Sequence, residues 1–175
     1  MSRVAKKIVS TKGVEIKEEN RVLSFKGSFG QMKIKLHEDI LVNTDDSSKT
    51  VFVSGDKATM ALKGTFIRLI ENAIIGVTKG FEKNIKLNGV GYKAMLDGKR
   101  LKLNVGLSHE VFLDIPENIN IKLPNVVNIN ITSCDKELLG LFADRLCKSK
   151  KYNVYNGTGI LDSSKFYIKK ETKKK

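Results

Sequence analysis

The sequence predicts an α+β protein made of two tandem duplicated domains, each a small, mainly antiparallel β-sheet covered by one α-helix. Three observations lead to this fold class. The 175-residue chain holds several short segments in which apolar and polar residues alternate, a pattern typical of half-buried strands. In each half these segments precede one helical pattern, and strands followed by a helix, without βαβ alternation, indicate antiparallel sheets. The pattern of the first half also returns in the second half.

The internal repeat lies in the pattern of residue types rather than in residue identity. A shift of 79 residues superposes the alternating segment 32–36 on 111–115, and the dipeptide Asp-Lys at 56–57 on the same dipeptide at 135–136. The alternating segment before Gly27 fits better at a shift of 78, which a one-residue bulge or insertion explains. The same fold is therefore expected twice along the chain.

The first domain is expected to span residues 1–82 and to begin with a basic arm. Its strands are predicted by alternating segments near 14–18, 21–26, 31–36 and 50–53. A helix is expected from about 57 to 79, with Asp56 as its N-cap, because an Asp side chain accepts hydrogen bonds from the free N–H groups of a first helical turn. The apolar face of this helix is expected to consist of Leu62, Phe66, Leu69, Ile70 and Ala73.

The second domain is expected to span residues 83–175 and to end in a basic tail that binds a polyanion. Its strands are predicted near 84–95, 99–105, 110–115 and 126–132, and Asp97-Gly98 is a typical two-residue turn between paired strands. A helix is expected from about 136 to 150, capped by Asp135. Its apolar face is expected to consist of Leu138, Leu139, Phe142 and Leu146.

The net charge of +13 comes from 32 Lys and Arg against 19 Asp and Glu, and it is concentrated at the ends. Residues 148–175 hold nine basic and two acidic residues, whereas residues 81–147 are almost neutral. A smaller basic cluster near the start includes Arg3, Lys6 and Lys7. Both ends are therefore expected to be arms that bind a polyanion. No apolar run is long enough for a membrane span or a secretory signal, so we expect a soluble protein with no membrane partner.

The segment after the second predicted helix mixes charge, aromatic rings and glycine. Its members are Lys148, Lys150, Lys151, Tyr152, Tyr155, Gly157 and Gly159. Lysines neutralise phosphates, aromatic rings stack on bases, and bare glycine backbone admits a close approach, so this mixture favours RNA binding. A plain surface loop is the alternative explanation.

Neither disulfide nor metal chemistry is expected. Cys134 and Cys147 lie in or beside one predicted helix, which separates them by about 20 Å, whereas bridged Cα atoms lie about 6 Å apart. No second Cys or His stands at zinc-binding spacing from either, and His37 and His109 are isolated in strand-like surroundings. We therefore expect small buried thiols in a reducing compartment, and neither a metal nor another cofactor.

No constellation of catalytic groups is present in the sequence, so no enzymatic activity is expected. Acidic residues are scattered or stand at predicted helix caps, without a paired carboxylate or a base beside a nucleophile. The segment 89–93 lacks the Gly-Lys-Ser/Thr of a phosphate loop and the third glycine of a dinucleotide loop. Gly91 marks either a backbone with positive φ or a place where another backbone, such as that of RNA, comes close. Lys93 beside it favours a phosphate partner.

Several motifs together resemble the large-subunit ribosomal protein six family over essentially the whole chain. Residues 64–81 resemble the first helix of that family and its exit, and Leu-Asn-Gly-Val-Gly-Tyr-Lys-Ala at 87–94 matches its central motif. The pair Ser108-His109 resembles a Ser-His pair of its second domain, but a Glu follows where the family usually has a proline. Near the C-terminus, 152–159 keeps the tyrosine and both glycines of a Tyr-Lys-Gly-Lys-Gly run and lacks its two lysines and two preceding prolines.

The resemblance implies a structural protein that binds large-subunit rRNA near the sarcin-ricin loop and the base of the factor-binding stalk, and it makes the basic C-terminal tail of the second domain an rRNA-binding tail. Its partners would be that rRNA and the neighbouring ribosomal proteins, with translational GTPases as indirect partners and no homo-oligomer. Its location would be the ribosome, in the cytoplasm or in an organelle. An extra-ribosomal RNA-binding or RNA-chaperone module on the same scaffold is the alternative function, and a small enzyme is a more distant one.

Charge, composition and resemblance together nominate one set of RNA-binding residues. The predicted residues are Arg3, Lys6, Lys7, Arg68, Gly89, Gly91, Tyr92, Lys93, Ser108, His109, Lys148, Lys150, Lys151, Tyr152, Tyr155, Asn156, Gly157, Thr158, Gly159, Lys165, Lys169, Lys170, Lys173, Lys174 and Lys175.

Overall fold

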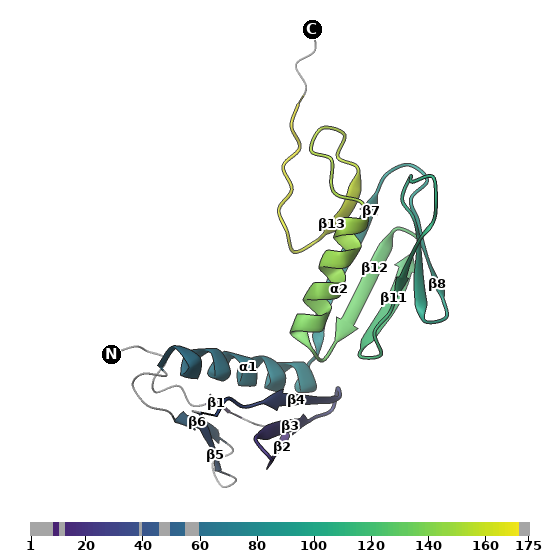
Figure 1. The fold of residues 1–175 in the computed structure, drawn as a ribbon. Helices are drawn as coiled ribbons and strands as arrows, with labels where there is room; N and C mark the ends of the chain where they lie inside the picture. The colour runs from purple at the N-terminus through teal and green to yellow at the C-terminus, as the bar shows by residue number, and fades with distance from the viewer. Residues whose placement is uncertain (1–8, 11–12, 39, 46–49, 55–59, 172–175) are drawn as a thin grey trace. The chain divides into compact units, whose positions relative to one another are not determined.

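The chain divides into two compact units, unit 1 of Met1–Gly80 and unit 2 of Phe81–Lys175 (Figure 1). The structure, a computed structural model, describes residues 9–10, 13–38, 40–45, 50–54 and 60–171. Each unit combines antiparallel sheets with one helix, so the predicted α+β class is confirmed. Asp56, the predicted cap of the first helix, lies outside the described residues.

Unit 1 contains two three-stranded antiparallel sheets, with the orders β2-β3-β4 and β1-β6-β5. The strand bounds are β1 (Val9–Ser10), β2 (Glu15–Glu19), β3 (Val22–Lys26), β4 (Gln31–Lys35), β5 (Leu41–Asp45) and β6 (Thr50–Ser54). Helix α1 (Met60–Thr78) contacts strands of both sheets. Leu23, Phe25 and Ile34 alternate along β3 and β4 and are buried in the core of this unit.

The buried face of α1 is rotated relative to the face that the sequence predicted. It consists of Ile67, Ile70, Ala73, Ile74 and Val77. The prediction was right for Ile70 and Ala73, and Phe66 packs half-buried against the core, but Leu62 and Leu69 are 36% and 40% exposed. Because α1 carries apolar residues around much of its circumference, the pattern fits two neighbouring stripes, and only the packing on the sheets distinguishes them.

Unit 2 contains a four-stranded sheet of order β11-β12-β7-β13 and a three-stranded sheet of order β10-β9-β8, both antiparallel. The strand bounds are β7 (Phe81–Asn88), β8 (Lys93–Asp97), β9 (Arg100–Asn104), β10 (Val111–Asp114), β11 (Ile119–Asn125), β12 (Asn128–Ser133) and β13 (Gly159–Asp162). The turn that joins β8 to β9 is Gly98-Lys99, one residue after the predicted Asp97-Gly98, because Asp97 ends β8 and pairs with Arg100.

Helix α2 (Lys136–Ser149) covers the four-stranded sheet, where it contacts β7, β12 and β13. Its N-cap is Asp135, as predicted: the carboxylate accepts hydrogen bonds from the N–H groups of Glu137 and Leu138 at 2.8 and 3.4 Å. The buried face of α2 consists of Leu139, Phe142, Ala143 and Leu146, while the predicted Leu138 is half-buried.

The two units repeat each other strand by strand. A shift of 78 places β2 and β3 on β8 and β9, and a shift of 79 places β4, β5 and β6 on β10, β11 and β12. The pairing order β2-β3-β4 matches β8-β9-β10, and β1-β6-β5 matches β7-β12-β11. Strand β13 has no counterpart in the described sheets of unit 1.

Three details differ from the prediction. The segment expected as one strand at 84–95 is two strands, β7 and β8, separated by a turn at 89–92. Strands β1, β5 and β11 were not assigned: β1 and β5 are short and hold few apolar residues, and only the alternation of Ile119, Ile121 and Leu123 marks β11. The basic C-terminal segment is not a free arm over its described part, because β13 pairs with β7 and buries Ile160.

Candidate nucleic-acid interface

The basic segment after α2 forms a closed loop at residues 150–158. The N–H of Asn153 donates to the carbonyl of Thr158 and the N–H of Gly157 donates to the carbonyl of Asn153, both at 2.8 Å. The side-chain oxygen of Asn153 accepts the N–H of Tyr155 at 2.9 Å, as in an Asx turn. The loop therefore has a defined backbone although it lacks the prolines of the family pattern.

Two other segments of unit 2 donate hydrogen bonds to this closed loop. The side-chain amide of Asn88, at the end of β7, donates to the carbonyl of Gly157 at 2.6 Å. The chain after β13 returns to the loop, where the N–H of Lys170 donates to the carbonyl of Val154 at 2.9 Å. The ring of Tyr152, in the loop, contacts the ring of Tyr167, which follows β13: the ring centroids are 5.0 Å apart and the ring planes are inclined at 58°. Tyr152 therefore has a packing contact, and Tyr155 is the more exposed of the loop's two tyrosines.

Gly159 closes the loop by a backbone approach that only glycine permits. Its φ is 142°, and a Cβ at this position would lie 2.7 Å from the Cα of Tyr152 and 2.8 Å from the carbonyl oxygen of Lys151. Gly157 is also buried. The packing of the described chain therefore explains why glycine occupies both positions, without any contact with RNA.

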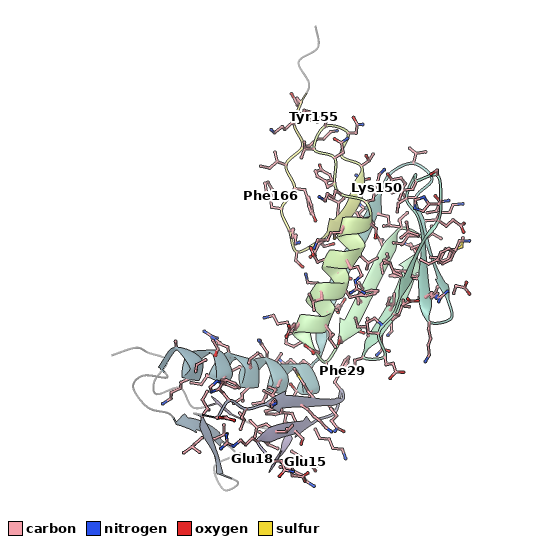
Figure 2. All side chains as sticks on the ribbon, viewed as in Figure 1. Glu15, Glu18, Phe29, Lys150, Tyr155 and Phe166 are labelled. Carbon is pink, nitrogen blue, oxygen red and sulfur yellow. The ribbon has the colours of Figure 1, made fainter. Side chains whose placement is uncertain are left out.

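Around this loop, cations and exposed aromatic side chains occur together (Figure 2). Tyr155 is 53% exposed and Phe166, which the sequence analysis missed, is 91% exposed. Lys150 is half-buried, while Lys148 is exposed and pairs with Asp144 at 2.8 Å. The other exposed candidates of the segment are Lys151, Asn156, Lys165, Lys169 and Lys170, and Thr158 is half-buried. Exposed ammonium groups beside exposed rings suit phosphates and unstacked bases.

The ion pair between Lys83 and Asp162 holds the end of β13. Lys83 on β7 donates to the carboxylate of Asp162 at 2.8 Å, and Asp162 is 1% exposed. Burial opposes the charge of this carboxylate, but the hydrogen bonds from Lys83 and from the N–H of Ser164 outweigh it, so the pKa of Asp162 is lowered. The N–H of Asp162 also donates to the hydroxyl of Tyr167 at 3.0 Å.

The central motif forms a tight turn between β7 and β8. The N–H of Tyr92 donates to the carbonyl of Gly89 at 3.3 Å, and Gly91 has φ 75°, the sign that the third position of a type II turn requires. The positive φ favours the structural explanation of Gly91, although no heavy atom of the described chain would lie within 4 Å of an added Cβ. Tyr92 is only 9% exposed and packs in the core of unit 2, which leaves little of its ring for a ligand, whereas Lys93 is exposed.

The remaining candidates are not brought together by the described structure. Ser108 and His109 are exposed between β9 and β10. Arg68 lies on α1 of unit 1 and pairs with Glu71 at 2.9 Å. The candidates outside the described residues are Arg3, Lys6, Lys7, Lys173, Lys174 and Lys175.

The two thiols are shielded rather than activated. Burial raises the pKa of Cys134, and burial together with the charge of Asp162 raises the pKa of Cys147. A raised pKa keeps both thiols protonated and weakly nucleophilic near neutral pH. Within the described ranges, His, Cys, Asp and Glu form no group of three or more that could hold a metal ion, and no helix is long and apolar enough to cross a membrane.

Fold and site together define a basic binding protein built from a duplicated α+β module, with exposed cations and aromatic rings around a glycine-closed loop. A family model described as Ribosomal protein L6 matches residues 11–80 and 88–163. The chain belongs to this family, which confirms the resemblance seen in the sequence.

Curated relatives match the chain from end to end. A protein named "Large ribosomal subunit protein uL6" from Rhodopseudomonas palustris (strain BisB5) is 40% identical over 177 residues, covering 100% of both chains. Proteins of the same name from Teredinibacter turnerae and Neisseria gonorrhoeae are each 36% identical, again with 100% of both chains covered. The two segments matched by the family model correspond to the two structural units.

Proposed function

We propose that this protein is a structural constituent of the large ribosomal subunit and binds large-subunit rRNA through the basic segment that follows α2. The observation that carries the proposal is the closed loop at 150–158, flanked by exposed lysines and by the exposed rings of Tyr155 and Phe166. Family membership and the names of the full-length relatives support the same assignment.

The chemistry of the segment suits RNA structure more than one base sequence. Ammonium groups contact phosphates and release their counterions, which provides affinity without sequence readout. The exposed rings can stack on bases that protrude from a loop or bulge. On this proposal the site lies near the sarcin-ricin loop and the stalk base, beside other ribosomal proteins. The protein holds rRNA in its folded arrangement and so takes part in translation on cytoplasmic ribosomes. Translational GTPases are indirect partners.

Point substitutions test the proposal better than truncation does. Deleting residues 148–175 would remove β13 and with it the buried Ile160, so lost binding would also reflect lost folding. The double variant Lys151→Gln/Lys169→Gln removes two exposed charges and no buried side chain. We expect it to sediment less with large subunits after a moderate salt wash, and its rRNA affinity to fall with a shallower dependence on salt.

The matched control is Lys122→Gln/Lys136→Gln, which removes two exposed lysines of unit 2 outside the segment. Equal retention of both variants on large subunits would contradict the assigned surface. Parent protein found free of ribosomes and bound to diverse RNAs would instead favour an extra-ribosomal RNA-binding or chaperone function.

A further inference from the structure

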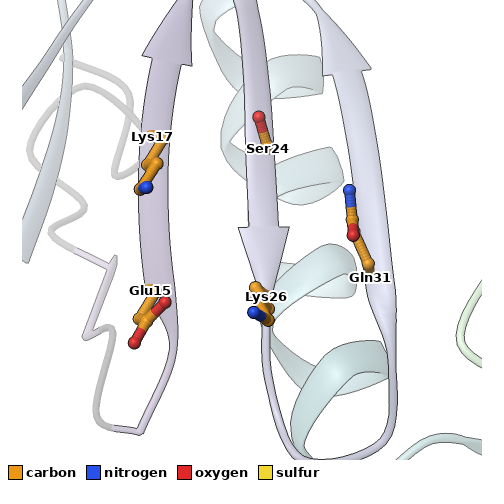
Figure 3. Close-up of a pocket in the computed structure, with 5 residues that line it drawn as sticks. All are labelled: Glu15, Lys17, Ser24, Lys26 and Gln31. Atoms are coloured by element: carbon orange, nitrogen blue, oxygen red, sulfur yellow. The ribbon is translucent and has the colours of Figure 1, made fainter.

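The outer face of the sheet β2-β3-β4 in unit 1 carries a cluster of lysines around a shallow depression (Figure 3). Figure 3 shows the depression's side chains on the side of the sheet away from α1. The cavity has a volume of about 180 Å³. The residues that line it are Glu15, Lys17, Ser24, Lys26 and Gln31. The proposed function uses none of these side chains.

The strand register places two lysines on either side of a hydroxyl. Lys17 on β2 is directly opposite Ser24 on β3, and Ser24 is directly opposite Lys33 on β4. Neighbouring strands lie about 4.8 Å apart, so the two lysine Cα atoms are about 10 Å apart with the serine between them. Both long side chains can therefore reach one group bound above Ser24.

The neighbouring row extends the same chemistry. Lys26 on β3 is opposite Gln31 on β4. Ammonium, hydroxyl and amide groups all donate hydrogen bonds, so the β3 and β4 side of the depression is a cluster of donors. Glu15 on β2 is directly opposite Lys26, and Glu15 and Glu19 flank Lys17 on the same face, so the β2 edge is less favourable to an anion than the β3 and β4 side.

The equivalent face in unit 2 carries different side chains, and two of its cations are in ion pairs. Its central row is Met95, Lys102 and Phe112. Here Lys102 pairs with Glu110 at 2.8 Å and lies 5.9 Å from the centroid of the Phe112 ring, and Arg100 pairs with Asp114 at 2.8 Å. Two cations of this face, Lys102 and Arg100, are thus paired within the unit, whereas Lys93 on β8 is exposed. No such pair within 4 Å involves Lys17, Lys26 or Lys33 among the described residues of unit 1.

We propose that this unit 1 face, centred on Lys17, Ser24 and Lys33, is a second RNA-binding surface that contacts the phosphate backbone of a structured RNA. Its described rows contain no aromatic or arginine side chain, so they lack both the rings that stack unpaired bases and the residues that dominate protein interfaces. Lys17, Ser24 and Lys33, side by side across the three strands, can contact the phosphates of an RNA duplex. Proteins recognise such a duplex by the shape and charge of its backbone.

The test compares two double variants of the full chain for binding to a short RNA duplex over a range of salt concentrations. Lys17→Gln/Lys33→Gln should weaken binding about tenfold and lower the slope of log affinity against log salt by about 1.5, since two phosphate contacts are lost. The matched control, Lys99→Gln/Lys102→Gln, removes two paired lysines from unit 2 and should change the slope by much less. Thermal unfolding of each variant checks that the fold is intact.

Three outcomes would overturn the proposal. One is an unchanged slope for Lys17→Gln/Lys33→Gln, and another is an equal loss in both variants, which would reflect net charge alone. The third is a loss confined to vesicles of phosphatidylglycerol or to single-stranded poly(U), which would assign the face to lipid headgroups or to unpaired RNA. Lys151→Gln/Lys169→Gln, measured on the same duplex and on ribosomes, keeps the two proposals separate, because it tests the C-terminal segment alone.

Discussion

The two units bury equivalent positions and differ at the positions they expose. Leu23 and Phe25 in β3 correspond to Leu101 and Leu103 in β9, and all four are fully buried. On the opposite side of the same strands, Ser24 corresponds to Lys102. The comparison teaches that the duplicated pattern specifies the core, while the outer faces are free to acquire different partners.

The second difference lies beyond the helix. In unit 2 the chain continues from α2 into the closed loop and β13, which adds a fourth strand beside β7. In unit 1 the described sheets have three strands each. Unit 2 therefore positions its basic loop with hydrogen bonds and a buried ion pair that unit 1 does not contain among its described residues.

The largest expected effect comes from Gly159→Val, which tests whether disruption of β13 destabilises unit 2 without destabilising unit 1. The new side chain would meet the backbone of Tyr152 and Lys151, and φ of 142° disfavours any residue but glycine. We expect unit 2 to lose about 3 kcal/mol or more of its free energy of unfolding, with the transition of unit 1 unchanged. Hydrogen exchange measured on each unit checks this.

Gly140→Ala is the control for Gly159→Val, because no heavy atom outside the helix backbone would lie within 4 Å of the new methyl group. Alanine in a helix interior should stabilise unit 2 by about 0.5 to 1 kcal/mol. Equal destabilisation of both units by Gly159→Val would break the comparison, since it would mean that the units unfold together.

A smaller effect is expected from Lys83→Met, which removes the cation facing Asp162. The buried carboxylate would lose its charged hydrogen bond, so unit 2 should lose about 2 kcal/mol at neutral pH. The pKa of Asp162 is lowered in the folded state, so its charge stabilises the fold above its unfolded pKa of about 3.9. That contribution is lost as pH falls through the folded pKa.

The pH dependence is therefore the sharper measurement for Lys83→Met. The stability difference between parent and variant should shrink below about pH 4, where the parent also loses the charge of Asp162. A difference that stays constant from neutral to acid pH would mean that Lys83 acts only through its methylene packing.

The sequence predicted most of the fold because alternation and capping are local signals. The repeat, the hairpin turn at Gly98, predicted to within one residue, and the cap at Asp135 depend on residues close in sequence. Strand β13 depends instead on a distant partner, β7, and its sequence is preceded by glycines that suggest a loop. The burial of Tyr92 was missed for a similar reason, because its ring packs against Gly106 as well as Gly89.

The candidate site was predictable in composition but not in geometry. Lysines and Tyr155 were recognisable as an RNA-binding mixture, whereas the exposed Phe166, eleven residues beyond that tyrosine, was missed although Lys165 and Lys169 flank it. The basic face of unit 1 was also missed, because Lys17 and Lys33 become neighbours of Ser24 only through strand pairing. Charge counted along the chain cannot show charge gathered across a sheet.

A third and smaller effect concerns the helix caps, and it would sharpen the comparison between units. Asp135→Ala removes the acceptor for two N–H groups of α2 and should cost unit 2 about 1 kcal/mol. The repeat places Asp56 at the corresponding position, so Asp56→Ala is predicted to cost unit 1 a similar amount. Chemical denaturation of both variants measures the two losses, and no loss for Asp56→Ala would show that the units begin their helices differently.

The smallest expected effect is that of Gly91→Ala, in the turn of unit 2 that joins β7 to β8. With φ at 75° an alanine is strained by about 1 kcal/mol, yet no heavy atom of the described chain would lie within 4 Å of its methyl group. We expect the thermal midpoint to fall slightly and occupancy of large subunits to fall only as far as that lower stability explains. Gly98→Ala, at φ 57° in the turn between β8 and β9 with the same open space, is the matched control. If Gly91→Ala loses occupancy that Gly98→Ala keeps at equal stability, RNA backbone approaches Gly91, and the turn has a binding role beyond its conformation.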